Sequence, residues 1–172
     1  MTSHLIDDFV HRARDWEVSG LDCVFCDIIS GQLPCYKLYE TDQVVAILDI
    51  QPIRRGHTLV IPKTHIQRLS DLPPEVAGVV GAAISRVAGA ICRGLSITAL
   101  NVVSNQEYAQ AVPHVHYHIV PAPDLSGTAM NKGSIESAPA GGSSIFMREW
   151  LRRGELDDSE GRRLSEQIRS RL

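Results

Sequence analysis

The sequence predicts an α+β domain in which an antiparallel sheet of about five strands is backed by one long helix. Five short stretches have the β-branched and aromatic content of strands, and most of them are joined by short turns. One helical pattern of about twenty residues separates the third stretch from the fourth. The chain has 172 residues, of which 44% are hydrophobic and 22% are charged, and this fits a single globular domain with extensions.

Turn residues and prolines bound the expected strands. Thr41 and Asp42 separate the first two, Gly56 supplies the loop before the third, and Pro62 ends the third. The last strand carries alternating histidines and ends at Pro121. The strands are expected at 36–40, 44–50, 57–61, 98–104 and 114–121.

Helices are expected before, between and after these strands. A short helical turn follows Cys26 and stops at Gly31, and Pro73 and Pro74 occupy the first turn of the long helix. Residues 124–144 are rich in Gly, Ser, Ala and Pro, which is typical of a loop. Helices with an apolar stripe are expected at 3–16 and 73–93, and two short C-terminal helices are expected at 145–153 and 159–172. We therefore expect an N-terminal helical extension (1–20), a central domain (21–124) and a Gly/Ser-rich loop with a C-terminal helical tail (125–172).

The long helix has an unusually small and smooth surface. Glycine inside a helix costs up to about 1 kcal/mol relative to alanine, so several glycines together need a reason. Close packing against the sheet is one reason, and a symmetric contact with a second copy of the chain is another. We expect a homodimer formed through the 73–93 helix, whose small residues are Gly78, Gly81, Ala82, Ala88 and Gly89.

Charge and composition argue against several classes of partner. The formal net charge of −3 gives no general attraction for nucleic acid or for an anionic membrane, and no apolar run approaches a membrane span. The first sixteen residues contain three aspartates and no continuous apolar segment, so no secretory signal is expected. Four unevenly spaced cysteines do not form a disulfide framework, and we expect a reducing compartment, the cytoplasm or the nucleus.

Three histidines alternate along the last strand, at positions 114, 116 and 118. Alternate side chains of a strand share a face and lie about 7 Å apart, and buried imidazoles need hydrogen-bond partners or a metal. A Cys-x-x-Cys pair, Cys23 and Cys26, could form half of a zinc site that His65 and His114 complete. Three alternating histidines could instead hold a catalytic zinc with an open position. The spacing alone leaves both assignments open.

Three blocks, taken together, resemble the histidine triad family and more closely its branch of nucleotide-binding phosphoramidases. The blocks run from Cys23 to Ile29, from Gly56 to His65 and from His114 to Val120, and they occur in the family's order. The resemblance covers about one hundred residues, from Cys23 to Pro121. It implies a fold of the histidine triad type.

The resemblance assigns a role to each histidine of the three blocks. It implies that His116 attacks the α-phosphorus and carries a covalent nucleotidyl group, which water then hydrolyses. His118 corresponds to a histidine beside the phosphate, and His57 corresponds to one that supports the triad through hydrogen bonds. The resemblance also implies one structural Zn²⁺ per chain, held by Cys23, Cys26, His65 and His114.

The resemblance further implies how a purine nucleotide binds. Asp49 corresponds to the carboxylate that accepts hydrogen bonds from ribose hydroxyls. Gln110 and Asn105 correspond to residues near the phosphate or the leaving group. Their loop departs from the family pattern, since residues 104–111 are shorter and contain no glycine, and this affects the choice of leaving group. The base pocket would be lined by Phe25, Ile28, Ile47 and Ile50.

The expected activity is cleavage of nucleoside 5′-phosphoramidates, of the AMP-NH2 or AMP-lysine type, through nucleotidyl-His116. One alternative is hydrolysis of a dinucleoside polyphosphate such as Ap3A or Ap4A. An alternative from another class is a nucleotide-binding or interaction protein without catalysis, although all three histidines of the triad are present.

Overall fold

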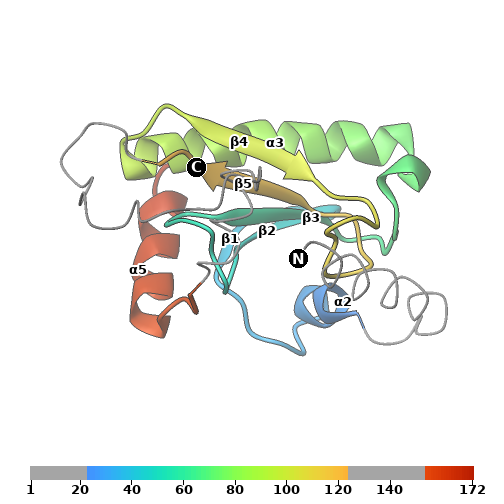
Figure 1. The fold of residues 1–172 in the computed structure, drawn as a ribbon, viewed down its shortest axis with the longest axis horizontal. Coiled ribbons are helices and arrows are strands. Elements are labelled where there is room, and N and C mark those ends of the chain that lie inside the picture. Colours follow the sequence, from blue (N-terminus) through green and yellow to red (C-terminus); the bar gives the residue numbers. More distant parts are fainter. Residues whose placement is uncertain (1–22, 124–153) are drawn as a thin grey trace, which may run out of the picture.

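The structure, a computed structural model, describes residues 23–123 and 154–172. The expected N-terminal extension, the helix at 3–16, the Gly/Ser-rich loop and the helix at 145–153 lie outside these residues. Figure 1 shows the arrangement of the described elements. In chain order they are α2 (Val24–Ile29), β1 (Lys37–Glu40), β2 (Val44–Leu48), β3 (Thr58–Pro62), the 3-10 turn η1 (Leu69–Asp71), α3 (Pro74–Leu95), β4 (Leu100–Ser104), β5 (Tyr117–Pro121) and α5 (Asp158–Arg169).

The strands form one sheet in the order β1-β2-β3-β5-β4, and every neighbouring pair is antiparallel. β5 therefore lies between β3 and β4, and its His118 is level with Leu59 on one side and Val103 on the other. The predicted α+β class, with a five-stranded antiparallel sheet backed by a long helix, is confirmed.

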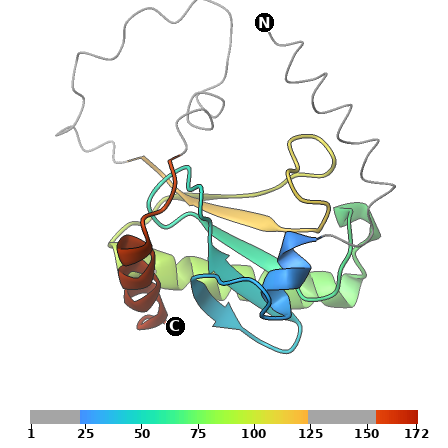
Figure 2. The ribbon, with the colours of Figure 1, turned by 90° about the horizontal axis from the view of Figure 1, so that it is seen from below.

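The sheet is covered on both faces. Alternate residues of β2 and β3 point to opposite sides, which is why every residue of these two strands is buried. Ala46, Leu48 and Val60 belong to the main core with α3 and α5, whereas Ile47 and Leu59 pack with Phe25 of α2. Figures 1 and 2 show α3 and α2 on opposite sides of the sheet, with α5 beside the carboxyl end of α3.

The histidine strand is shorter than the sequence predicts. β5 begins at Tyr117, so His114 and His116 lie in the segment that leads into it. The paired register with β3 stops at Tyr117 opposite Val60. Pro62 has no N–H to extend this ladder, and its carbonyl accepts a hydrogen bond from the His114 ring, with Nε2 and oxygen 2.8 Å apart.

The other boundaries agree with the prediction to within three residues, and the C-terminal helix starts after an N-cap. Asp157 accepts hydrogen bonds from the backbone N–H groups of Ser159 and Glu160. By length and composition alone, α3 is long and apolar enough to cross a membrane. The prediction that no apolar run approaches the length of a membrane span is therefore wrong for this helix. Val80, Val87 and Ile91 of α3 lie in the core against the sheet, which makes α3 the core helix of this domain.

Candidate active site and metal centre

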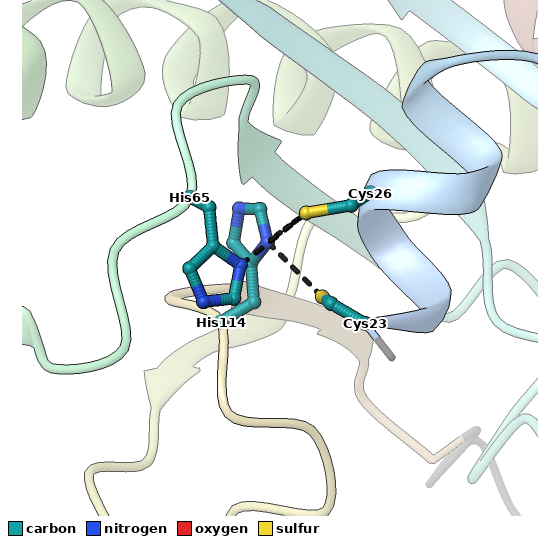
Figure 3. Close-up of side chains that lie close together, drawn as sticks. All are labelled: Cys23, Cys26, His65 and His114. Carbon is teal, nitrogen blue, oxygen red and sulfur yellow. Dashed lines mark hydrogen bonds between the residues drawn. The ribbon is translucent and has the colours of Figure 1, made fainter. Parts of the chain in front are cut away.

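Two cysteines and two histidines from three separate segments converge beside α2 (Figure 3). Cys23 is the N-cap of α2, and the helix brings Cys26 back to the same side about one turn later. His65 follows β3, and His114 precedes β5. The four ligand atoms, two sulfurs and two Nδ1 atoms, lie within 4.8 Å of one another.

The distances within this cluster fit a tetrahedral metal ion. The Nδ1 atom of His114 lies 3.4 Å from the Cys23 sulfur and 3.7 Å from the Cys26 sulfur, and His65 Nδ1 lies 3.3 Å from the Cys26 sulfur. A zinc ion with bonds of about 2.3 Å to sulfur and about 2.05 Å to nitrogen places such pairs about 3.5 Å apart. The residues therefore fit the ion that the sequence predicts.

The protonation of the cluster also suits a metal. Because His114 donates from Nε2 to the Pro62 carbonyl, its Nδ1 carries the lone pair that faces the sulfurs. Burial lowers the pKa of His114 to about 4, so that its ring is neutral at neutral pH. Burial, and then the neighbouring Cys23, raises the pKa of Cys26 to about 11, so a metal ion must displace a proton from this thiol.

His116 presents a lone pair on one defined nitrogen. Its Nδ1 donates to the backbone carbonyl of His114 over 2.7 Å, which leaves Nε2 unprotonated in the neutral ring. The side chain is buried, and its ring meets the edge of Phe25 with centroids 5.1 Å apart. Burial lowers the pKa of His116, against a smaller opposite effect of the hydrogen bond to His114. The result is a neutral imidazole suited to nucleophilic attack.

His118, His57 and Asp49 form a buried series of side chains behind His116. The rings of His118 and His116 are 4.9 Å apart between centroids, and His57 Nε2 lies 2.9 Å from His118 Nδ1. The Ile53 N–H donates to His57 Nδ1 over 3.2 Å, which places the proton of neutral His57 on Nε2. Asp49 Oδ2 is also 3.2 Å from Nδ1, so this carboxylate lies at the far end of the series from His116.

The two clusters separate the roles of the three alternating histidines. Among residues 23–123 and 154–172, the groups of three or more His, Cys, Asp or Glu whose ligand atoms converge are the Cys23 cluster and the Asp49, His57 and His118 series. His114 belongs to the first and His118 to the second, so the described residues do not form a three-histidine metal site. The distance of 2.9 Å between His57 Nε2 and His118 Nδ1 is that of a hydrogen bond between the two rings.

Gln110 lies at the predicted place ahead of the triad, and its side chain organises its own loop. Its amide nitrogen donates to the carbonyls of Gln67 and Val112, and its oxygen accepts from the Glu107 N–H. Asn105 donates to the Ala109 carbonyl over 3.3 Å. The predicted contact of both amides with phosphate remains a prediction, and in this structure they hold the loop.

The same loop is fastened to η1 by residues that sequence reasoning did not identify. Arg68 pairs with Glu107, and the Ser70 N–H donates to the side chain of Gln106 over 2.9 Å. Glu107 and Ala109 both adopt φ near +57°, where the sequence has no glycine. In the sequence, the only sign that this turn is unusual was that residues 104–111 contain no glycine, unlike the family pattern.

Three of the four residues expected in the base pocket come together. Phe25 and Ile47 lie in one buried cluster, and Ile28 packs against it. Ile50 is 60% exposed at the beginning of the loop after β2. Phe25 also contacts the rings of His114 and His116, whereas the apolar side chain of Ile50 is not part of the described core.

Comparison with known proteins agrees with this arrangement. Residues 30–124 match the HIT domain. An adenylylsulfatase of Arabidopsis thaliana is 40% identical over 102 residues, which are 58% of this chain and 52% of that protein. The chain therefore spans about half the length of this relative. An adenosine 5′-monophosphoramidase of Schizosaccharomyces pombe is 39% identical over 106 residues, which are 60% of this chain and 77% of that protein.

Solved structures extend the likeness to the fold, and one of them is a zinc-bound protein. A Zn-bound histidine triad family protein from Mycobacterium smegmatis is 36% identical, with a TM-score of 0.61 over 87% of this chain and 94% of that one. A Hit-like protein from Bartonella henselae has a TM-score of 0.68 and 27% identity, over 88% of this chain and 97% of that one. With its domain match, its five-stranded sheet and its two histidine clusters, the chain belongs to the HIT family, which is the histidine triad family.

Proposed function

We propose that the chain is a nucleotide hydrolase that cleaves nucleoside 5′-phosphoramidates through a covalent nucleotidyl group on His116. The observation that supports this most directly is the 2.7 Å hydrogen bond from His116 Nδ1 to the His114 carbonyl. It fixes the tautomer in which Nε2 is free to attack phosphorus. Relatives named for adenosine monophosphoramidate and adenylylsulfate support an adenine nucleotide as substrate.

The proposed reaction has two displacements. First, the Nε2 lone pair forms a bond to the α-phosphorus, the P–N bond to the leaving amine breaks, and the amine takes up a proton as it departs. Then water attacks the same phosphorus and returns a proton to the group that protonated the amine, the bond to His116 breaks, and the nucleoside monophosphate leaves with the imidazole neutral again. Two displacements with good nucleophiles replace one difficult attack by water.

The contacting side chains of His118, His57 and Asp49 are suited to move the protons of these steps. With Ile53 donating to His57 Nδ1, His57 donates from Nε2 to His118 Nδ1, and the His118 proton is then on its Nε2. His118 lies next to His116, so it can donate to a phosphate oxygen or to the leaving group. Asp49, at the outer end of this series, is the residue we propose for the ribose hydroxyls.

We further propose that Cys23, Cys26, His65 and His114 hold one structural zinc ion. When bound, the ion supplies rigidity by joining three segments and by fixing His114, whose carbonyl orients His116. The four protein ligands complete a tetrahedral shell, so the proposed role of the ion is structural.

The function is tested by incubating wild type and His116→Ala with an adenosine 5′-phosphoramidate and with a dinucleoside triphosphate. We expect wild type to release AMP from the phosphoramidate and to label His116 transiently, and we expect no turnover by His116→Ala. Preference for the dinucleoside triphosphate would favour the polyphosphate hydrolase. Tight nucleotide binding without turnover of either compound would favour the non-catalytic binding protein and contradict the enzyme.

We propose, finally, a homodimer that uses the outer side of α3. A Cβ added at Gly78 or Gly81 would meet nothing within 4 Å, so packing inside the described protomer does not account for these glycines. Close approach of a second backbone would account for them. Sedimentation equilibrium should give twice the monomer mass for wild type and a weaker association for Gly81→Leu; a monomeric wild type contradicts the dimer.

A further inference from the structure

The loop between β2 and β3, residues 49–57, holds two members of the proposed site at its ends. Asp49 donates from its backbone to the His57 carbonyl over 2.9 Å, and Asp49 Oδ1 accepts from the Gln51 N–H over 2.8 Å. The His57 N–H in turn donates to the Arg54 carbonyl over 2.9 Å. The position of the Asp49 carboxylate therefore depends on the conformation of this loop.

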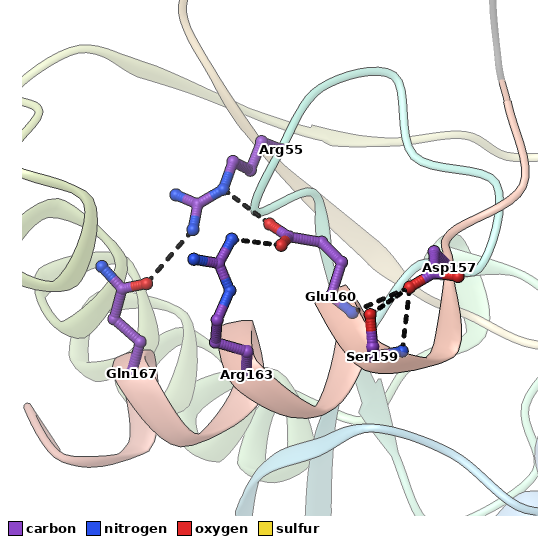
Figure 4. Close-up of polar contacts among 6 residues, drawn as sticks. All are labelled: Arg55, Asp157, Ser159, Glu160, Arg163 and Gln167. Carbon is purple, nitrogen blue, oxygen red and sulfur yellow. Dashed lines mark hydrogen bonds and ion pairs between the residues drawn. The ribbon is translucent and has the colours of Figure 1, made fainter.

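The outer side of the loop is held by the C-terminal segment. The Leu156 N–H donates to the carbonyl of Ile50, the residue after Asp49, over 2.8 Å. Arg55, two residues before His57, reaches two turns of α5: its Nε lies 2.8 Å from Glu160 and its Nη2 lies 3.1 Å from Gln167 (Figure 4). Both ends of the loop are thus fastened to residues more than one hundred positions away in sequence.

α5 is a firm support because it is itself anchored in the core. Leu164 and Ile168 are fully buried in the cluster that includes α3. A Cβ added at Gly94 of α3 would lie 3.3 Å from the Cα of Ile168, which shows how closely the two helices approach. Gln167, besides accepting from Arg55, donates to the Gly94 carbonyl over 2.7 Å.

We propose that the C-terminal helix is a positioning element of the nucleotide site, with Glu160 and Gln167 as positioning residues that act through Arg55 on Asp49. This inference rests on the proposed function, because it assigns the ribose to Asp49. Loosening the contact lets the loop move and misplaces the carboxylate, while the metal cluster and His116, which lie on other segments, are unaffected. The predicted consequence is a loss of discrimination between ribose and deoxyribose.

The test measures binding of AMP and of 2′-deoxy-AMP by calorimetry to Glu160→Gln, which keeps the shape of the side chain and removes its charge. Exposed ion pairs change an equilibrium constant by roughly 1.4- to fivefold, so AMP affinity should fall by about that factor. Affinity for 2′-deoxy-AMP, which keeps only the 3′-hydroxyl, should fall less, so the ratio of the two affinities should decrease. A role limited to stability would lower the unfolding temperature and leave the ratio of the two affinities unchanged.

Two variants on the same helix are matched controls. Glu166→Gln makes the same charge change at an exposed position and should match wild type in both affinities. Arg163→Gln removes the intrahelical partner of Glu160 but keeps Arg55 in place. It should also leave the affinity ratio unchanged.

The outcomes separate this inference from the proposed function. An unchanged affinity ratio in Glu160→Gln overturns the positioning role, and so does a wild type with no preference for ribose or with no affinity for either nucleotide. Failure to hydrolyse a phosphoramidate overturns the proposed function and leaves the binding comparison valid. A double-mutant cycle with Arg55→Gln should show that the two substitutions are not additive.

Discussion

A single backbone carbonyl decides the chemistry of His116. An imidazole can attack phosphorus only from an unprotonated nitrogen, and the contact between Nδ1 and the His114 carbonyl determines which nitrogen that is. The same His114 residue points its Nδ1 toward the two cysteine sulfurs. One residue therefore orients the proposed nucleophile through its backbone and takes part in the proposed zinc site through its side chain.

Burial of His116 sets the expected pH dependence of the reaction. Its pKa is lowered below the ordinary value of 6.5, and only the neutral ring attacks. Turnover, measured as kcat/KM, should therefore hold down to pH 6.5 and then fall about tenfold per pH unit below the lowered pKa. The measurement is a pH profile with a nucleoside phosphoramidate, corrected for hydrolysis without enzyme. An acid limb centred above pH 6.5 would contradict the assignment.

The docking of α5 depends on the absence of a side chain at one position. A Cβ at Gly161 would come within 2.5 Å of the Tyr36 ring. The ring cannot easily move away, because the Tyr36 hydroxyl donates to Asp158 over 2.7 Å. That hydrogen bond lowers the pKa of Asp158 and so keeps it ionised as an acceptor. Gly161 is thus required by packing, although glycine is a poor helix former.

Gly161→Ala should lower the free energy of unfolding by about 1–3 kcal/mol, the usual cost of overpacking. In a Tyr36→Leu background the clash is relieved, and alanine should then gain up to about 1 kcal/mol from helix propensity. Denaturant unfolding of the four proteins of this cycle measures the coupling. Equal effects of Gly161→Ala in the two backgrounds would contradict a clash with Tyr36.

Elements with a clear local pattern were predictable from the sequence, and contacts between distant segments were not. The apolar residues of β2, β3 and α3 indicate those elements because each is largely fixed by burial. The predicted start of β5 was wrong because Pro62, on the neighbouring strand β3, ends the hydrogen-bonded pairing between these two strands. The contacts of Arg55 with α5 join residues over one hundred positions apart, and no periodicity signals them. For the same reason, the sequence did not predict that the Gln110 side chain donates to the distant Gln67 carbonyl and so holds its loop.

At the scale of the whole molecule, the sheet separates two clusters of buried residues, one on each of its faces. α3 and α5 form the main core on one face, and α2 with Cys23, Cys26, Phe25 and Ile47 lies on the other. The smaller cluster on the second face joins α2 to the sheet through a few apolar side chains. A metal ion at Cys23, Cys26, His65 and His114 would link the same segments, so the stability of this face should depend on it.

Zinc removal should therefore lower the unfolding temperature of wild type. A ligand present at a thousand times its Kd stabilises the folded state by about 4 kcal/mol, which sets the scale of the loss when a chelator removes the ion. Cys26→Ser should unfold at the lower temperature with or without chelator, and Cys92→Ser, whose sulfur is outside the cluster, should respond as wild type does. Calorimetry with parallel metal analysis measures both. If chelation removes the zinc and wild type unfolds at the same temperature, the ion does not brace this face, and the orientation of His116 must come from the His114 carbonyl and the Pro62 contact alone.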